Sequence, residues 1–238
     1  MNPRPPRPSL PGLLRAAICA LGVLAAVPAA AQVAPRAAEI SGYQGLHAAA
    51  HKGDVAQITR LATANADFNA RDGNGRTPLH VATFARHRDA IRALAKAGAR
   101  LDLLDHDRYD AVTIASVADD EETLRVLLSL GASAQQVTSR YDGTALIAAA
   151  HLGHFGVVKQ LIAAHAPLDH VNNLHWTAVI ESIVLGNGGL RHQQTLSALI
   201  KAGANLQLAD RQGNTPLALA GTRGYAEMVR LLEQAGAR

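Results

Sequence analysis

Two kinds of apolar segment alternate along the chain from about residue 41 to the end. Segments of the first kind are built on small residues, as around Ala82 and Ala149. Segments of the second kind carry larger side chains at helical spacing, as in Val157-Val158 followed by Leu161-Ile162. This pattern predicts pairs of helices, a thin one and then a thicker one. Each pair has too little core to fold alone, so stacked neighbours must share a continuous core.

The pairs recur with a period of 33 residues. Gly98-Ala99 is repeated at Gly131-Ala132, and Gly203-Ala204 at Gly236-Ala237, at that spacing. These glycines are expected to close the second helix of a pair, where a left-handed residue is needed. Thr77-Pro78 is expected to begin a first helix, because threonine caps helices and proline is favoured at the first helical position.

The segment Thr77-Pro78-Leu79-His80-Val81-Ala82 carries the complete T-P-L-H-x-A signature, so the sequence resembles the ankyrin-repeat family. The resemblance covers about residues 41–238 and implies an all-α ankyrin-repeat solenoid with short β-turn fingers. Its expected repeats are 38–70, 71–103, 104–136, 137–170, 171–207 and 208–238. The first repeat is degenerate and is expected to be a cap. Repeat four ends in His165-Ala166-Pro167 instead of Gly-Ala, and repeat five carries about five extra residues near 187–191.

Residues 1–31 have the layout of a signal peptide. Three arginines and no acidic residue precede an uncharged, mainly apolar run over 16–27 and an alanine cleavage motif at 29–31. The run is shorter than the roughly 20 residues that a membrane span needs. We therefore expect cleavage after Ala31, a linker over 32–40, and a bacterial protein that is periplasmic or secreted, with no membrane span in the mature chain. An uncleaved anchor is the alternative.

Removal of residues 1–31 changes the composition. The formal charge falls from +4 to +1, because three arginines leave without an acid, and Cys19, the single cysteine, leaves as well. A chain without a thiol is compatible with an oxidising compartment. A charge near zero, with no basic stripe carrying aromatics, argues against a nucleic-acid partner.

The resemblance implies a non-catalytic module that binds a protein partner through its finger loops and the concave face of its first helices. Carried over by position, the candidate contacts are Arg76, Phe84, His106, Tyr109, Arg140, Tyr141, Asp142, His151, Leu152, His175, Trp176 and Arg223. Aromatics exposed on loops of a rigid scaffold are typical binding hot spots. Tyr109, Tyr141 and Trp176 therefore either form a contact ridge for the partner or pack finger against finger and stiffen the solenoid. We expect a monomer, and the resemblance does not identify the partner.

Charge is segregated between neighbouring repeats. Residues 71–103 have a net charge of +4 and residues 104–136 a net charge of −5. The acidic run over 119–122 either complements the basic repeat and the positive end of a helix, or it docks a basic partner.

Residues able to support chemistry are scattered. His47 and His51 have a spacing that can hold a metal, but no intervening glutamate and no third ligand accompany them. Glu181 and His192 either form a polar site across the inserted loop or orient that loop by hydrogen bonding. We expect no catalytic residue, no cofactor and no metal. The alternative is a small-molecule, metal or enzymatic site near the repeat-five insertion, around Glu181, His175 and His192.

Overall fold

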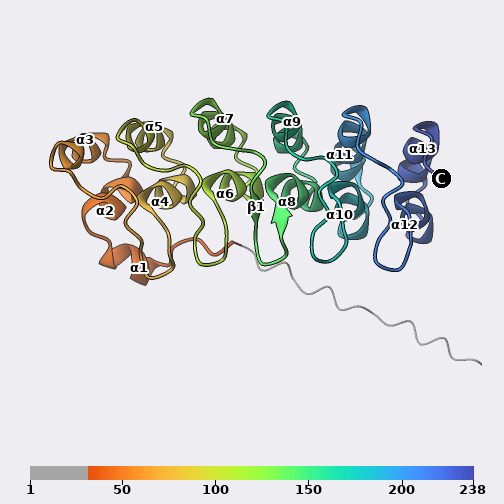
Figure 1. Ribbon diagram of the computed structural model, residues 1–238, viewed down its shortest axis with the longest axis horizontal. Helices are drawn as coiled ribbons and strands as arrows, with labels where there is room; N and C mark the ends of the chain where they lie inside the picture. Colours follow the sequence, from red (N-terminus) through yellow and green to blue (C-terminus); the bar gives the residue numbers. More distant parts are fainter. Residues whose placement is uncertain (1–31) are drawn as a thin grey trace, which may run out of the picture. The chain divides into compact units, whose positions relative to one another are not determined.

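The computed structural model describes residues 32–238, in which the chain forms thirteen helices and one two-stranded hairpin. Twelve of these helices lie in two layers, inner and outer (Figure 1). The inner layer consists of α2 (Gly45–Lys52), α4 (Pro78–Phe84), α6 (Ala111–Val117), α8 (Ala145–Leu152), α10 (Ala178–Val184) and α12 (Pro216–Thr222). The outer layer consists of α3 (Val55–Thr63), α5 (Arg88–Lys96), α7 (Glu121–Ser129), α9 (Phe155–Ala163), α11 (Leu190–Lys201) and α13 (Ala226–Gln234).

Each inner helix and the outer helix that follows it form one repeat, so the expected all-α solenoid of six repeats is confirmed. Among the described residues, no helix has the length and apolar character needed to cross a membrane. The predicted signal peptide lies outside the described residues.

Short polar side chains begin the inner helices, as the capping pattern predicts. Thr144 Oγ1 accepts a hydrogen bond from the backbone N–H of Ile147 at 3.3 Å. In repeat three, which departs from the signature, Asp110 Oδ1 accepts from the N–H of Thr113 at 2.7 Å. Aspartate caps a helix as well as threonine does, so this departure preserves the fold.

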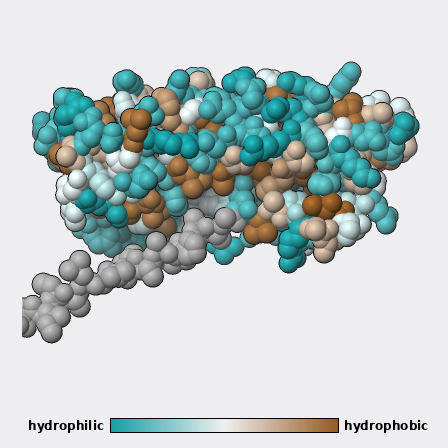
Figure 2. All heavy atoms as spheres, turned by 180° about the vertical axis from the view of Figure 1, so that it is seen from behind, coloured by the Kyte–Doolittle hydropathy of each residue, from teal (hydrophilic) through white to brown (hydrophobic). Residues whose placement is uncertain are grey.

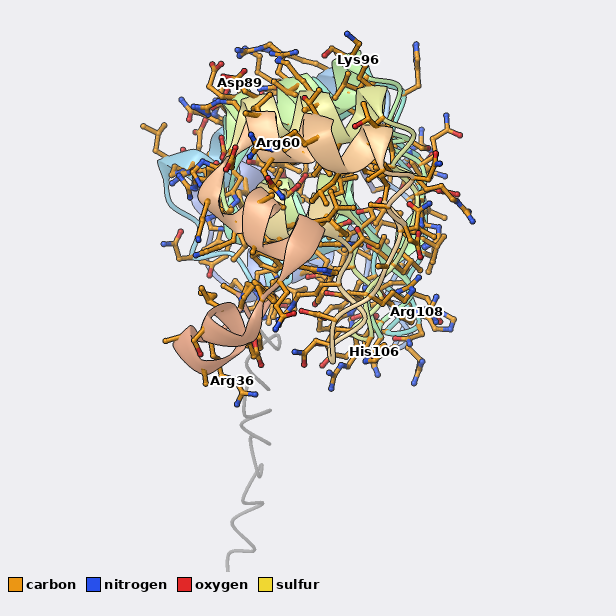
Figure 3. The ribbon with its side chains drawn as sticks, turned by 90° about the vertical axis from the view of Figure 1, so that its left-hand side faces the viewer. Arg36, Arg60, Asp89, Lys96, His106 and Arg108 are labelled. Carbon is orange, nitrogen blue, oxygen red and sulfur yellow. The ribbon has the colours of Figure 1, made fainter. Side chains whose placement is uncertain are left out.

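The core lies between the two layers. The alanines that keep the inner helices thin are at most 1% exposed, and they are Ala82, Ala115, Ala149 and Ala220. Leu127 and Leu161 from the outer helices are fully buried against them. On the face seen in Figure 2, hydrophilic residues cover the outer layer and apolar residues gather in patches below it. The charged side chains of Arg60, Asp89 and Lys96 project from the outer layer in Figure 3.

Left-handed residues end most outer helices. Gly98, Gly131, Gly203 and Gly236 have φ between 82° and 99°, as predicted. In repeat four His165 takes this place with φ 60°. A side chain in the left-handed region costs roughly 1–2 kcal/mol, so His165 is a strained position.

The fingers are tight turns that precede the inner helices. Only the fourth, within the described residues, contains strands: β1 (Val137–Thr138) pairs antiparallel with β2 (Gly143–Thr144). In other fingers an aspartate organises the turn. Asp72 Oδ1, for example, accepts hydrogen bonds from the backbone N–H groups of Asn74 and Arg76 at 2.8 and 2.9 Å.

The extra residues of repeat five join several repeats. Two of them lengthen the turn between α10 and α11, and three extend α11 to twelve residues instead of nine. Arg191, in the extension, donates to Asp119 Oδ2 at 2.5 Å and to the carbonyl of Gly153 at 3.1 Å. Tyr225 of repeat six donates its hydroxyl to the carbonyl of Gly186 at 3.0 Å. The insertion therefore connects repeats three to six, beyond the nearest-neighbour contacts of a simple solenoid.

The N-terminal segment has structure of its own. The expected linker contains the start of a short helix, α1 (Ala37–Gly42), which precedes the first repeat. Tyr43 follows it and donates its hydroxyl to Asp72 Oδ2 at 2.8 Å, which ties this segment to the finger of repeat two.

Candidate functional site

The fingers stand side by side and are joined by backbone hydrogen bonds. His106 N–H donates to the carbonyl of Asn74 at 3.0 Å, and Ser139 N–H to that of Arg108 at 2.8 Å. Asn173 N–H donates to the carbonyl of Tyr141 at 2.9 Å. Figure 3, a view along the row of repeats, places His106 and Arg108 at the projecting ends of the fingers. The fingers thus form one continuous row.

This row contains the predicted aromatics. Tyr109, Tyr141 and Trp176 are each partly exposed, between a buried and an open position. Burial is the largest cause that raises the pKa of Tyr109 above its ordinary value. This intermediate exposure of all three residues is compatible with a contact ridge and with packing between fingers.

The polar residues of the ridge join neighbouring fingers. Arg140 Nη2 donates to Asp107 Oδ1 at 3.0 Å, and Arg108 lies 3.2 Å from Asp142 Oδ1. The ring of His106 packs against Gly75, where a Cβ would approach it to 2.4 Å. These contacts stiffen the row, while side chains such as Arg140 stay more than half exposed. His175 is also exposed.

One predicted contact residue is buried. Arg76 was expected on an exposed finger, but its side chain is only 4% exposed. Its Nη1 donates to Glu39 Oε2 at 2.9 Å and its Nη2 to the carbonyl of Val33 at 2.7 Å. The ring of Phe84, itself partly buried, lies 5.8 Å from the guanidinium carbon. Arg76 lacks the expected exposure because residues 33–39 cover it, and a repeat pattern contains no information about that segment.

The concave candidates differ in accessibility. Leu152 is 39% exposed and Arg223 is exposed. His151 is partly buried, and its Nδ1 lies 3.3 Å from Glu181 Oε2. Glu181 is buried, and its Oε1 accepts from Asn172 Nδ2 at 3.0 Å.

Sequence reasoning missed the role of Asn172. Its Oδ1 accepts from the N–H groups of Leu174 and Trp176, as Asp72 does in repeat two, while its amide nitrogen donates to Glu181. The sequence contained a signal for this role, because the fingers of repeats two, three and six have aspartate at the equivalent positions 72, 105 and 210. The change to asparagine supplies the donor that a buried carboxylate needs. Glu181 therefore holds the finger that carries Trp176.

The alternative site around Glu181, His175 and His192 is not assembled. His192 Nδ1 lies 3.1 Å from Asn187 Oδ1 and its Nε2 lies 2.9 Å from the carbonyl of His151, so both ring nitrogens are engaged. His192 orients the inserted loop, which was one of the two interpretations, and Glu181 pairs with other residues. His175 is exposed on its finger.

His47 and His80, in the first two repeats, each contact a backbone carbonyl in the finger of the next repeat. His80 Nδ1 accepts from the N–H of Thr77 at 3.0 Å, so its Nε2 donates to the carbonyl of Tyr109 at 3.0 Å. Burial lowers the pKa of His80 to about 4. His47 Nε2 contacts the carbonyl of Arg76 at the same 3.0 Å, so it is the equivalent histidine of repeat one. No cluster of three or more potential metal ligands occurs within residues 32–238.

The acidic run is engaged within the solenoid. Asp120 is buried, caps α7 through the N–H of Thr123, and lies 3.6 and 3.8 Å from the guanidinium nitrogens of Arg86 and Arg88. Asp119 binds Arg191. The contacts of Asp120 correspond to the interpretation that opposite charges attract neighbouring repeats, whereas the contact of Asp119 reaches two repeats along the chain.

Comparison with known proteins identifies the repeat type. A family model described as ankyrin repeats (3 copies) matches residues 46–139 and 146–238. A putative ankyrin repeat protein of Escherichia coli, YahD, is 34% identical over 190 residues, which cover 79% of this chain and 94% of YahD.

Solved structures with a similar fold also contain ankyrin repeats. An ankyrin repeat domain from Acinetobacter baumannii is 44% identical with a TM-score of 0.77, and the match covers 81% of this chain and 98% of that domain. A chain in the complex of the predatory endopeptidase Bd0816 from Bdellovibrio bacteriovorus with the immunity protein Bd3460 is 25% identical with a TM-score of 0.67. That match covers 81% of this chain and 98% of the other.

Proposed function

The chain belongs to the ankyrin-repeat family, and we propose that it is an exported, non-catalytic module that binds a protein partner through its finger tips and concave face. Ankyrin repeats in general are protein–protein interaction modules, and a similar chain occurs in a complex between an endopeptidase and an immunity protein. The scaffold fixes the shape of the surface and leaves the choice of partner to its side chains.

The row of fingers is the observation that carries this proposal. Backbone hydrogen bonds hold the fingers in register, so the partly exposed residues Tyr109, Tyr141 and Trp176 keep fixed positions along the row. Rigid aromatics lose little conformational entropy when they bind, which suits them to act as anchors. His106, Arg140, Asp142 and His175 would form the polar rim of the same surface.

The test is a binding assay with matched variants. A Tyr109→Ala/Trp176→Ala double variant and a Phe155→Ala control on the outer layer are compared with the wild type. We expect the wild type and the control to retain one protein from a periplasmic extract, and the double variant to lose it while its melting temperature stays close to that of the wild type. A double variant that keeps every partner but is less stable would show that the aromatics only pack between fingers.

The proposed export has a separate test. The signal layout of residues 1–31 supports cleavage after Ala31, which predicts an intact mass that begins at Gln32. A secreted protein whose mass begins upstream of residue 25 would contradict this.

A further inference from the structure

The buried Arg76 occupies a position that the proposed function assigns to the partner-binding surface in other repeats. It immediately precedes the residue that caps the first helix of its repeat, as Tyr109, Trp176 and Asn214 do in theirs. Those three are partly or fully exposed, whereas Arg76 is covered by the chain's own residues 33–39. In Figure 3, α1 with Arg36 lies at the lower edge of the molecule, apart from the finger ends at His106 and Arg108.

The covering segment contacts Arg76 with two acceptors of different kinds. The carboxylate of Glu39 accepts a hydrogen bond from Nη1, and the carbonyl of Val33, six residues earlier, accepts one from Nη2. Asp72 lies 3.6 Å from Nη1, so the guanidinium stays paired when a ligand is exchanged. Together these groups form a pocket for one carboxylate with an extended segment in front of it.

The cover fills this pocket incompletely. The Nε of Arg76 is buried and has no hydrogen-bond acceptor. A guanidinium has five donors and binds carboxylates best in a bidentate pair, so Glu39 leaves binding energy unused. Beside this pocket, an open hollow of about 510 Å³ between α1 and the finger is lined by Ala38, Glu39 and Asn74 among others, but not by Arg76.

Apolar contacts hold the covering segment only at its C-terminal end, where Tyr43 packs against the core and its ring centroid lies 5.5 Å from that of His47. The helix α1 has six residues and none of them is buried. Hydrogen bonds from Arg36 and from Arg76 lower the pKa of Glu39 to about 2, so the carboxylate is ionised near neutral pH. Residues 33–42 are held by one cation and a few hydrogen bonds, and such an attachment opens more readily than a packed element does.

We propose that residues 33–43 are an internal ligand of a carboxylate-binding site centred on Arg76, and that an acidic segment of the protein partner displaces them. This inference rests on the proposed function, because it assigns a partner chemistry to one end of the same finger row. The matching partner segment is non-helical and then enters a helical turn that carries an Asp or Glu, as residues 33–36 and the first turn of α1 do. The segment therefore competes with the partner for Arg76, so a partner must bind this site more tightly than the segment does in order to displace it.

A peptide exchange experiment tests the site without knowledge of the partner. The probe is a fluorescein-labelled peptide with the sequence of residues 32–43, and the matched probe carries Glu39→Gln. Fluorescence anisotropy measures the binding of both to the full-length wild type, to Glu39→Ala, and to a Glu233→Ala control that removes an exposed acid on α13. We expect Glu39→Ala to bind the acidic peptide at least tenfold more tightly than the wild type and the Glu233→Ala control do. We expect Glu39→Ala to bind the Gln peptide at least tenfold more weakly than it binds the acidic peptide.

Two results would overturn the proposal. One is equal binding of the two peptides by Glu39→Ala, and the other is an absence of binding. Hydrogen exchange on the wild type gives a second measurement that needs no variant: saturating acidic peptide should accelerate exchange in α1, and unchanged exchange would contradict displacement. If the peptide fails while the finger aromatics still govern partner binding, the proposed function stands and only this inference falls.

Discussion

The buried His80 should make the stability of the protein depend on pH in one particular window. Its ring is neutral in the folded chain, since Nδ1 accepts from Thr77 N–H and Nε2 donates to the carbonyl of Tyr109. Burial lowers its pKa from 6.5 to about 4. Between these values the unfolded chain binds a proton at this histidine and the folded chain does not. Stability from neutral His80 is therefore complete above pH 6.5 and declines as pH falls towards 4.

The size of this effect follows from the difference between the two pKa values. One pKa unit corresponds to about 1.4 kcal/mol, so His80 alone should remove about 3 kcal/mol of unfolding free energy between pH 6.5 and 4. Repeats three to six have Thr113, Ile147, Ile180 and Ala218 at the equivalent position. A histidine that contacts a carbonyl of the next finger therefore occurs at this position only in the first two repeats, as His47 and His80.

Urea unfolding at several pH values between 4.5 and 7.5 measures the effect, with His80→Gln as the matched variant. Glutamine retains hydrogen-bonding capacity and does not titrate. All other ionisable groups are shared, so the difference between the two proteins isolates His80. We expect the wild type to lose its advantage over the variant as pH falls. Parallel curves for the two proteins would refute the assignment of a neutral, buried His80.

Three further predictions concern the C-terminal half. Arg191→Ala should lower the unfolding free energy by about 1 kcal/mol and make repeats three to six open less cooperatively in hydrogen exchange, because it removes the link to Asp119; unchanged cooperativity would argue against this link. His165→Gly should raise the unfolding free energy by about 0.5–1 kcal/mol in urea melts by relieving the left-handed strain, and a loss of stability would count against strain there. Glu181→Ala should cost about 1–3 kcal/mol and shift the fluorescence of Trp176, the single tryptophan, because the finger loses its anchor; an unchanged spectrum would contradict the anchoring role.

The repeat pattern predicted the fold because each repeat specifies its own caps and core. Thr77-Pro78, Asp110 and the glycines at 98, 131, 203 and 236 act within a few residues of chain, so their roles can be read locally. The position of the insertion was also predictable from the period.

Contacts between distant segments could not be predicted in this way. Arg191 and Asp119 are 72 residues apart, and only the three-dimensional stack brings them together. Arg76 was assigned to an open finger because nothing in the period indicates that Glu39 would cover it. His47 and Asn172 are intermediate cases, because alignment of the repeats with one another contains the signal for both.

Site-specific photocrosslinking tests the central claim most directly. A photoreactive phenylalanine analogue replaces Trp176 on the finger row or, as the control, Phe155 on the outer layer, and both proteins are irradiated in their native compartment. The account predicts one discrete protein adduct from position 176 and none from position 155. The same adduct from both positions, or an adduct from position 155 alone, would contradict binding through the fingers and the concave face.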